Sequence, residues 1–194
     1  MIVNNVNNKK VVEILKDSSA LLKGHFLLRS GLHSEYFFQC ARVGEDLKNV
    51  SMLMKILLEQ VKSNLPAFET VVAPAMGALV FGQELARQSG ARFIFLEKVS
   101  NNLVLRRNFK IAAGERVLIV EDVITRGGRV EEAIKILNKH FVEISGVAVL
   151  VDRSGGNASF SVPHCSLLEM SFPTYKLDDM PEHLEKIPVV KPGS

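Results

Sequence analysis

The chain has 194 residues, of which 47% are hydrophobic and 23% charged, and its formal net charge is +3 at pH 7. This length fits one globular domain with small additions, and the composition excludes a disordered chain. The modest charge excludes a massively basic nucleic-acid-binding protein, although it permits a local basic pocket that binds anions.

The first part of the chain predicts a small mixed segment. Residues 9–22 carry apolar side chains at helical spacing and predict an amphipathic helix. In the stretch "GHFLLRSGLHSEYFFQC", Gly24 and Gly31 separate two β-like runs, which predicts a hairpin or a pair of antiparallel strands. Helical spacing returns over residues 46–62.

The central part alternates short apolar runs with amphipathic helices. The runs "TVVA", "RFIFL", "RVLIV" and "SGVAVLV" are separated by helical patterns in "GALVFGQELARQ" and "VEEAIKILNKH". Such alternation is typical of an α/β protein with a doubly wound parallel sheet that is covered on both faces. Ligands of these sheets bind beyond the carboxyl ends of the strands. The residues that follow each run are therefore the candidates for chemistry.

The end of the chain and the cysteines carry less information. We expect a short helix in "MPEHLEK" and an extended tail within residues 175–194. Cys40 and Cys165 have no spacing typical of a zinc site, so we expect them to be reduced and structural. No apolar run approaches the roughly 20 residues of a membrane span, and "MIVNNVNNKK" lacks the apolar core of a signal peptide. We expect a soluble, cytoplasmic protein without a membrane partner.

The stretch "VLIVEDVITRGGRVEEAIKIL" carries the sharpest signal. Residues 117–120 predict a buried strand, so Glu121 and Asp122 should emerge at its carboxyl end, before a helix that starts near Arg129. A glycine-rich loop that opens a helix offers backbone N–H groups to a phosphate. The acids repel phosphate and need hydroxyls or a cation instead, which predicts a ribose-phosphate site. The alternative is an ordinary strand-to-helix turn.

"VLIVEDVITRGG" resembles the phosphoribosyl-diphosphate (PRPP) binding motif of the type I phosphoribosyltransferases. More specifically, "GHFLLRSGLHSEYFFQ" is similar to the amino-terminal hood of the orotate phosphoribosyltransferase family, "VVAPAMGALVFGQELAR" to its pyrophosphate loop, and "VDR" to its base-binding strand end. The resemblance implies the type I phosphoribosyltransferase fold, as a single domain over residues 1–194 with hood elements in residues 1–45.

The resemblance also implies which residues bind PRPP. Glu121 and Asp122 would hold the ribose hydroxyls. The 5-phosphate would be wrapped by the loop of Val123, Ile124, Thr125, Arg126, Gly127, Gly128 and Arg129. The leaving pyrophosphate would be wrapped by Ala75, Met76 and Gly77, with Arg29 reaching the same region. A simple turn at "PAMG" and a solvated charge at Arg29 are the alternatives.

Orotate is planar and anionic, so its pocket needs an apolar face and a fork of donors. Phe37 and Phe38 match the aromatic pair that stacks on the base in the family, Arg153 matches the arginine that pairs with the carboxylate, and Thr125 would approach the pyrimidine. A core role is the alternative for the phenylalanines, because only one of two neighbours in a strand can face inward. A hydroxyl that caps the helix is the alternative for Thr125.

The chain departs from the family in one loop. Many orotate enzymes carry a mobile, lysine-rich loop with a histidine, whereas "LEKVSNNLVLRRNFKIAAG" has no histidine and resembles a shorter variant. Lys98, Arg106 and Arg107 are our candidates for stabilising the departing pyrophosphate, with Asp122 as a further catalytic residue. Small residues usually stand in the family where this chain has Arg126 and Arg129. We expect His25 and His33 to be structural.

The resemblance implies transfer of phosphoribosyl from PRPP to orotate, which gives orotidine 5'-monophosphate and pyrophosphate in pyrimidine biosynthesis. It also implies Mg²⁺ bound mainly through PRPP, without direct protein ligands, and a homodimer. A purine-specific phosphoribosyltransferase and a nucleic-acid-binding regulator that keeps the PRPP loop are the rivals. We expect PRPP and orotate as partners and no nucleic acid, because the net charge is low.

Overall fold

The computed structural model describes residues 6–28 and 30–192. The chain divides into two compact units, of which the first joins residues 1–46 to residues 171–194 and the second comprises residues 47–170. The stretch that predicts the ribose-phosphate site lies in the second unit.

The first unit is built around a four-stranded sheet with the strand order β10-β1-β2-β9. Helix α1 (Val6–Asp17) precedes β1 (Leu21–Leu27) and β2 (His33–Phe38), which pair antiparallel as predicted. The remaining elements are η1 (Cys40–Glu45), β9 (Thr174–Tyr175), η2 (Leu177–Asp179), α5 (Glu182–Glu185) and β10 (Val189–Val190). The short helix predicted near the end of the chain is confirmed by α5.

The helix predicted for residues 9–22 is wrong at its end. Helix α1 stops at Asp17, because the Ser18 hydroxyl donates to the carbonyl oxygen of Ile14 at 2.7 Å and Ser19 adopts a φ of 53°. A serine that bonds to the backbone of the preceding turn competes with continuation of the helix. The leucines at positions 21 and 22 consequently belong to β1.

His25 and His33 form a buried pair. Nε2 of His25 lies 2.6 Å from Nδ1 of His33, and Nδ1 of His25 lies 2.9 Å from the carbonyl oxygen of Ile187. Both histidines are less than 9% exposed. The pair links β1 and β2 to the segment before β10, in agreement with the structural role expected for both side chains.

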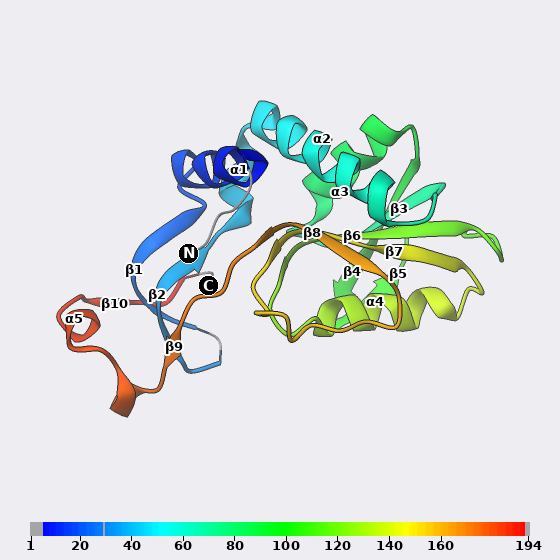
Figure 1. Ribbon diagram of the computed structural model, residues 1–194. Helices are drawn as coiled ribbons and strands as arrows, with labels where there is room; N and C mark the ends of the chain where they lie inside the picture. Colours follow the sequence, from blue (N-terminus) through cyan, green and yellow to red (C-terminus); the bar gives the residue numbers. More distant parts are fainter. Residues whose placement is uncertain (1–5, 29, 193–194) are drawn as a thin grey trace. The chain divides into compact units, whose positions relative to one another are not determined.

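The second unit holds a six-stranded sheet with the order β5-β4-β3-β6-β7-β8. Its elements are α2 (Leu47–Asn64), β3 (Thr70–Pro74), α3 (Leu79–Ser89), β4 (Arg92–Val99), β5 (Asn102–Leu105), β6 (Arg116–Ile124), α4 (Gly128–Asn138), β7 (Glu143–Asp152) and β8 (His164–Glu169). Neighbouring strands are parallel, apart from the antiparallel pair β4 and β5. Helices α2 and α3 cover one face and α4 the other (Figure 1), which confirms the doubly wound sheet. The sequence did not predict β5 or β8.

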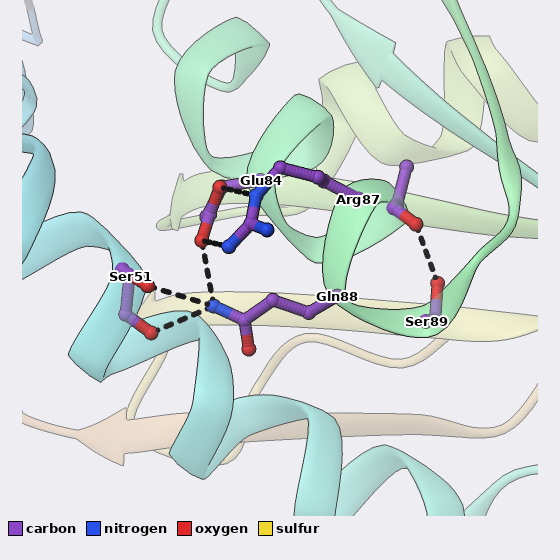
Figure 2. A network of polar contacts seen from close by, with 6 residues as sticks. Ser51, Glu84, Arg87, Gln88 and Ser89 are labelled. Atoms are coloured by element: carbon purple, nitrogen blue, oxygen red, sulfur yellow. Dashed lines mark hydrogen bonds and ion pairs between the residues drawn. The ribbon is translucent and has the colours of Figure 1, made fainter.

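The central strands form the core of this unit. The strand residues 71–73, 117–120 and 147–151 are all buried, as expected for parallel strands that are covered on both faces. On one face, polar contacts join α3 to α2: Gln88 Nε2 donates to the carbonyl oxygen of Ser51 at 2.8 Å and to Glu84 Oε1 at 2.7 Å (Figure 2). A hydrogen bond from Arg87 helps to lower the pKa of Glu84 to about 2. Glu84 is thus charged at neutral pH.

The connections place a switch point between β3 and β6. These two strands are neighbours, and the chain leaves β3 through α3 toward β4 but leaves β6 through α4 toward β7. The two connections therefore run in opposite directions along the sheet. In open α/β sheets, ligands bind in the crevice outside the carboxyl ends of the strands at such a point.

Two further expectations concern the cysteines and the membrane. Cys40 and Cys165 are both reduced. Burial raises the pKa of the Cys165 thiol to about 11, which makes this thiol a poor nucleophile at neutral pH and agrees with a structural role. Among the helices of the described residues, none combines the length and the apolar character needed to cross a membrane.

Candidate functional site

The two acids lie inside a strand and not after it. Strand β6 extends to Ile124, because Val123 pairs with Val151 and Ile124 with Asp152 of β7. The expectation that the strand ends at residue 120 is therefore wrong, and Val123 and Ile124 belong to β6 as well. The loop proper consists of residues 125–127, and α4 begins at Gly128, one residue before the predicted start. The strand fixes the backbone at both acids more firmly than a loop would.

Glu121 is a buried carboxyl group. It is 3% exposed; its Oε1 accepts the Asp122 N–H at 3.1 Å, and its Oε2 has no hydrogen-bond partner among the described residues. Burial and the charge of Asp122 raise the pKa of Glu121 well above its usual range, and Arg129 acts in the opposite direction. A buried carboxyl oxygen without a partner favours a ligand that donates hydrogen bonds or carries positive charge.

The turn after β3 lies directly against Asp122. A Cβ built on Gly77 would stand 2.2 Å from Asp122 Oδ2 and 2.8 Å from its Cγ, so only a glycine permits this approach. The peptide bond between Ala75 and Met76 is cis, and the Met76 side chain is 80% exposed. The structure thus brings the turn of residues 75–77 beside the carboxylate of Asp122. We name it the pyrophosphate turn after the role predicted for it.

The segment of residues 123–129, named here the phosphate loop after the role predicted for it, has two features that favour an anion. Gly127 has a φ of 74°, and a Cβ there would stand 2.6 Å from Cε1 of Phe160, so both the backbone and the packing require glycine. Gly128 opens α4 and is exposed. The first N–H groups of a helix have no partner within the helix, and the helix dipole adds partial positive charge there. Thr125, Arg126 and Arg129 are exposed around this end.

The ends of β6 and β7 bring two candidate base-binding residues together. The Arg153 N–H donates to the carbonyl oxygen of Ile124 at 2.8 Å, so Arg153 lies beside the point where Thr125 follows the strand. Asp152 Oδ1 accepts the Ser154 N–H at 2.6 Å and fixes the turn that follows β7. Thr125 and Arg153 are thus the residues that directly follow two adjacent strands, at the carboxyl end of the sheet that also carries Asp122.

The predicted basic segment forms a hairpin, here named the basic hairpin, of β4 and β5 with residues 106 and 107. Lys98 is exposed near the end of β4, opposite Leu103 of β5. Arg106 and Arg107 both form ion pairs with Glu97, at 3.6 Å for Arg106. A hydrogen bond from Arg107 lowers the pKa of Glu97. These ion pairs of Glu97 were not predicted from the sequence, although an acid in "LEKV" before the basic "LRR" was a signal for such pairing.

Three candidates fall within residues 1–46 and thus outside the second unit. Arg29 lies outside the described residues. Phe37 and Phe38 belong to the first unit, where Phe38 is 6% exposed and the ring of Phe37 packs on Phe26 with centroids 5.8 Å apart. Only one of the two phenylalanines is fully buried, in keeping with the alternation of a strand. Their contact with a base stays a prediction, as does the role of Arg29.

Comparison with known proteins identifies the family of this chain. The model of the phosphoribosyl transferase domain matches residues 45–159. A curated orotate phosphoribosyltransferase of Caldicellulosiruptor saccharolyticus is 44% identical over 189 residues, which cover 97% of this chain and 98% of that protein. One from Erythrobacter litoralis is 40% identical over 190 residues, with the same coverage.

Solved structures share the fold. The orotate phosphoribosyltransferase of Aeropyrum pernix superposes with a TM-score of 0.72 at 24% identity, over 82% of this chain and 93% of that one. The adenine phosphoribosyltransferase of Thermoanaerobacter pseudethanolicus has a TM-score of 0.60 at 18% identity, over 70% and 88% of the two chains. Orotate and adenine phosphoribosyltransferases share this fold, so the fold alone does not distinguish the two families. The sequence identity of 44% and 40% to curated orotate phosphoribosyltransferases, over nearly the full chain, does distinguish them. The chain belongs to the orotate phosphoribosyltransferase family.

Proposed function

We propose that this protein transfers the phosphoribosyl group of PRPP to orotate, giving orotidine 5'-monophosphate and pyrophosphate in pyrimidine biosynthesis. The observation that carries the proposal is the close approach of Gly77 to Asp122 at the switch point. This approach supports a pyrophosphate site in the turn beside a ribose site at Asp122, and the glycine-rich loop that follows β6 supports a 5-phosphate site next to them. Membership of the orotate phosphoribosyltransferase family supports orotate as the acceptor.

Each segment would bind one part of PRPP. Glu121 and Asp122 accept hydrogen bonds from the ribose hydroxyls, backbone N–H groups of the phosphate loop hold the 5-phosphate, and residues 75–77 hold the pyrophosphate. In the reaction, the bond from ribose C1 to the pyrophosphate oxygen breaks and its electron pair leaves with that oxygen. The orotate ring nitrogen bonds to C1 and loses its proton. Alignment and charge stabilisation are the contribution of the protein, and no covalent nucleophile is needed.

Mg²⁺ belongs to this proposal as the counter-ion of PRPP. The unpartnered Oε2 of Glu121 and the adjacent carboxylate of Asp122 are compatible with a cation nearby, since Mg²⁺ prefers oxygen ligands. Bound through the pyrophosphate and the ribose hydroxyls, the ion would neutralise charge on the leaving group. The two carboxylates would hold it indirectly, through those hydroxyls.

An ultraviolet assay of the purified protein tests the proposal. With PRPP and Mg²⁺ present, we expect loss of orotate absorbance and no turnover of adenine, hypoxanthine, guanine, xanthine or uracil. Turnover of a purine instead would keep the PRPP site but would contradict the orotate assignment. PRPP binding without turnover of any base would favour a regulator, and tight RNA or DNA binding at moderate salt would support that alternative.

Replacing Arg153 by alanine is expected to raise the Michaelis constant for orotate by about tenfold or more, because a charged hydrogen bond to the orotate carboxylate is worth roughly 1.5 to 3 kcal/mol. The constant for PRPP should change less than twofold. Steady-state kinetics with each substrate varied in turn provide the measurement. Equal increases for both substrates would show that Arg153 does not read the base.

We also propose that the protein acts in the cytoplasm as a homodimer. Support comes from the family resemblance, in which a basic loop serves the active site of the neighbouring subunit. Here the basic hairpin stands in the place of that loop. Light scattering of the purified protein would report its mass, and a monomer that retains full activity would contradict the dimer.

A further inference from the structure

The backbone of Arg129 lies in one segment of the candidate site, and its side chain contacts another. Its backbone lies in the first turn of α4, immediately after the glycines of the phosphate loop. Its side chain instead reaches the neighbouring segment, where Nη1 donates to the carbonyl oxygen of Ala75 at 3.1 Å. Ala75 is the first residue of the pyrophosphate turn. The guanidinium thus lies beside the predicted leaving-group site and not within its own loop.

A pocket lies along the same side chain. Its volume is about 220 Å³ and its walls are formed by Lys98, Asn101, Leu103, Arg129 and Glu132. Given a share of about 30 Å³ per water in the liquid, this space holds about seven waters or a group of similar size. Two cations and one carboxylate line it, so the pocket carries a formal excess of positive charge and favours an anion.

Glu132 has mainly a structural role in this pocket. Its Oε1 accepts the Leu103 N–H at 2.6 Å, which ties α4 to β5 of the basic hairpin. Leu103 stands opposite Lys98 in the register of β4 and β5. The same helix therefore fixes Arg129 against the pyrophosphate turn and holds the part of the hairpin that carries Lys98.

The two arginines of the basic hairpin are already ion-paired. Arg106 and Arg107 share the carboxylate of Glu97, so much of their charge is neutralised within the hairpin. Arg129 and Lys98 both line the anion-compatible pocket, whereas Arg106 and Arg107 do not line it. Of the cations that the basic hairpin and the first turn of α4 contribute within the described residues, Lys98 and Arg129 are therefore the two that line this pocket.

We propose that the side chain of Arg129 binds the pyrophosphate group of PRPP, and not the 5-phosphate that its own loop holds. The inference rests on the proposed function, because it assigns parts of the same PRPP site. A guanidinium offers a planar fork of donors to phosphate oxygens, and here that fork is oriented by its bond to the pyrophosphate turn. A small residue at position 129, usual in the family, would leave this contact to other groups.

The reverse reaction separates the two assignments, because orotidine 5'-monophosphate carries the 5-phosphate while pyrophosphate is a second substrate. We expect Arg129→Ser to raise the Michaelis constant for pyrophosphate by about tenfold, as for loss of a charged hydrogen bond, and that for orotidine 5'-monophosphate by less than twofold. Arg129→Lys should recover part of the loss. Arg116→Ser, at the amino end of β6 and paired with Glu69, is the matched control and should leave both constants unchanged.

Two outcomes would overturn the assignment: an equal or larger effect on orotidine 5'-monophosphate, or no effect of Arg129→Ser on either constant. If the wild-type protein turned over in neither direction, the proposed function would fail while this inference stayed testable. Calorimetric titration of pyrophosphate with Mg²⁺ into the wild type and Arg129→Ser would then decide. Weaker binding by the variant would support the inference, and equal binding or none by either protein would contradict it.

Discussion

Replacing Asp122 by asparagine is expected to lower kcat by about two to three orders of magnitude, the typical cost of losing one preorganised electrostatic contact. The amide keeps an oxygen that can accept the Val123 N–H, now bound to Asp122 Oδ1 at 2.8 Å, so the strand should keep its conformation. In the proposed site, the variant loses the negative charge that would face the ribose as positive charge develops at C1. The rate of orotate consumption at saturating substrate gives kcat.

The control for Asp122→Asn is Glu143→Gln, which removes one negative charge at the exposed first residue of β7, at the amino-terminal end of the strands. This control should retain wild-type kcat. Circular dichroism and the melting temperature should be unchanged in both variants. If Asp122→Asn turned over at a near-wild-type rate, the assignment of Asp122 to the ribose would be wrong.

Gly77→Ala is expected to lower kcat/KM for PRPP by about a hundredfold, because a shift of roughly 1 Å at a reacting centre costs that much. The new methyl group cannot remain 2.2 Å from Asp122 Oδ2, so either the pyrophosphate turn or the carboxylate must move. The turn is partly exposed, which limits the effect on stability. Kinetics with PRPP varied, together with thermal unfolding, provide the measurement.

Gly82→Ala offers the contrast to Gly77→Ala. Its Cβ would stand 2.8 Å from the Cβ of Ala73 and 3.0 Å from Cε2 of Phe93, inside the packing between α3 and the sheet. Overpacking of this kind costs about 1 to 3 kcal/mol of unfolding free energy. The same substitution should thus affect activity at position 77 and stability at position 82. Retention of kcat/KM within twofold by Gly77→Ala would contradict the proposed site.

Local patterns predicted most of the second unit. The apolar runs before Ala75, Glu121 and Arg153 became β3, β6 and β7, because parallel strands buried on both faces read as continuous apolar runs. The edge strands were harder to predict. Strand β5 has only four residues and is mostly partly exposed, so its alternation was too short to stand out beside the basic residues around it.

The sequence suggested which residues form the candidate site but not how they contact one another. The motif predicted Asp122 as a ligand of the ribose, yet nothing in the order of residues showed that Gly77, in the turn after β3, would lie against it. Likewise, the Arg129 side chain bonds to Ala75, and Glu97 forms ion pairs with two arginines. These contacts join residues that become neighbours only when the sheet forms. The end of β6 was misjudged, because acids inside a strand look locally like a loop.

The first unit combines two segments that are far apart in the sequence, and this affects how the chain folds during translation. Its sheet needs β9 and β10, and its histidine pair is held by the carbonyl of Ile187, all of which follow the second unit in the sequence. The second unit is continuous in sequence and can fold while translation proceeds. At synthesis rates of about 5 to 20 residues per second, β1 and β2 wait on the order of ten seconds for their partner strands. During that interval, chaperones have access to both unpaired edges.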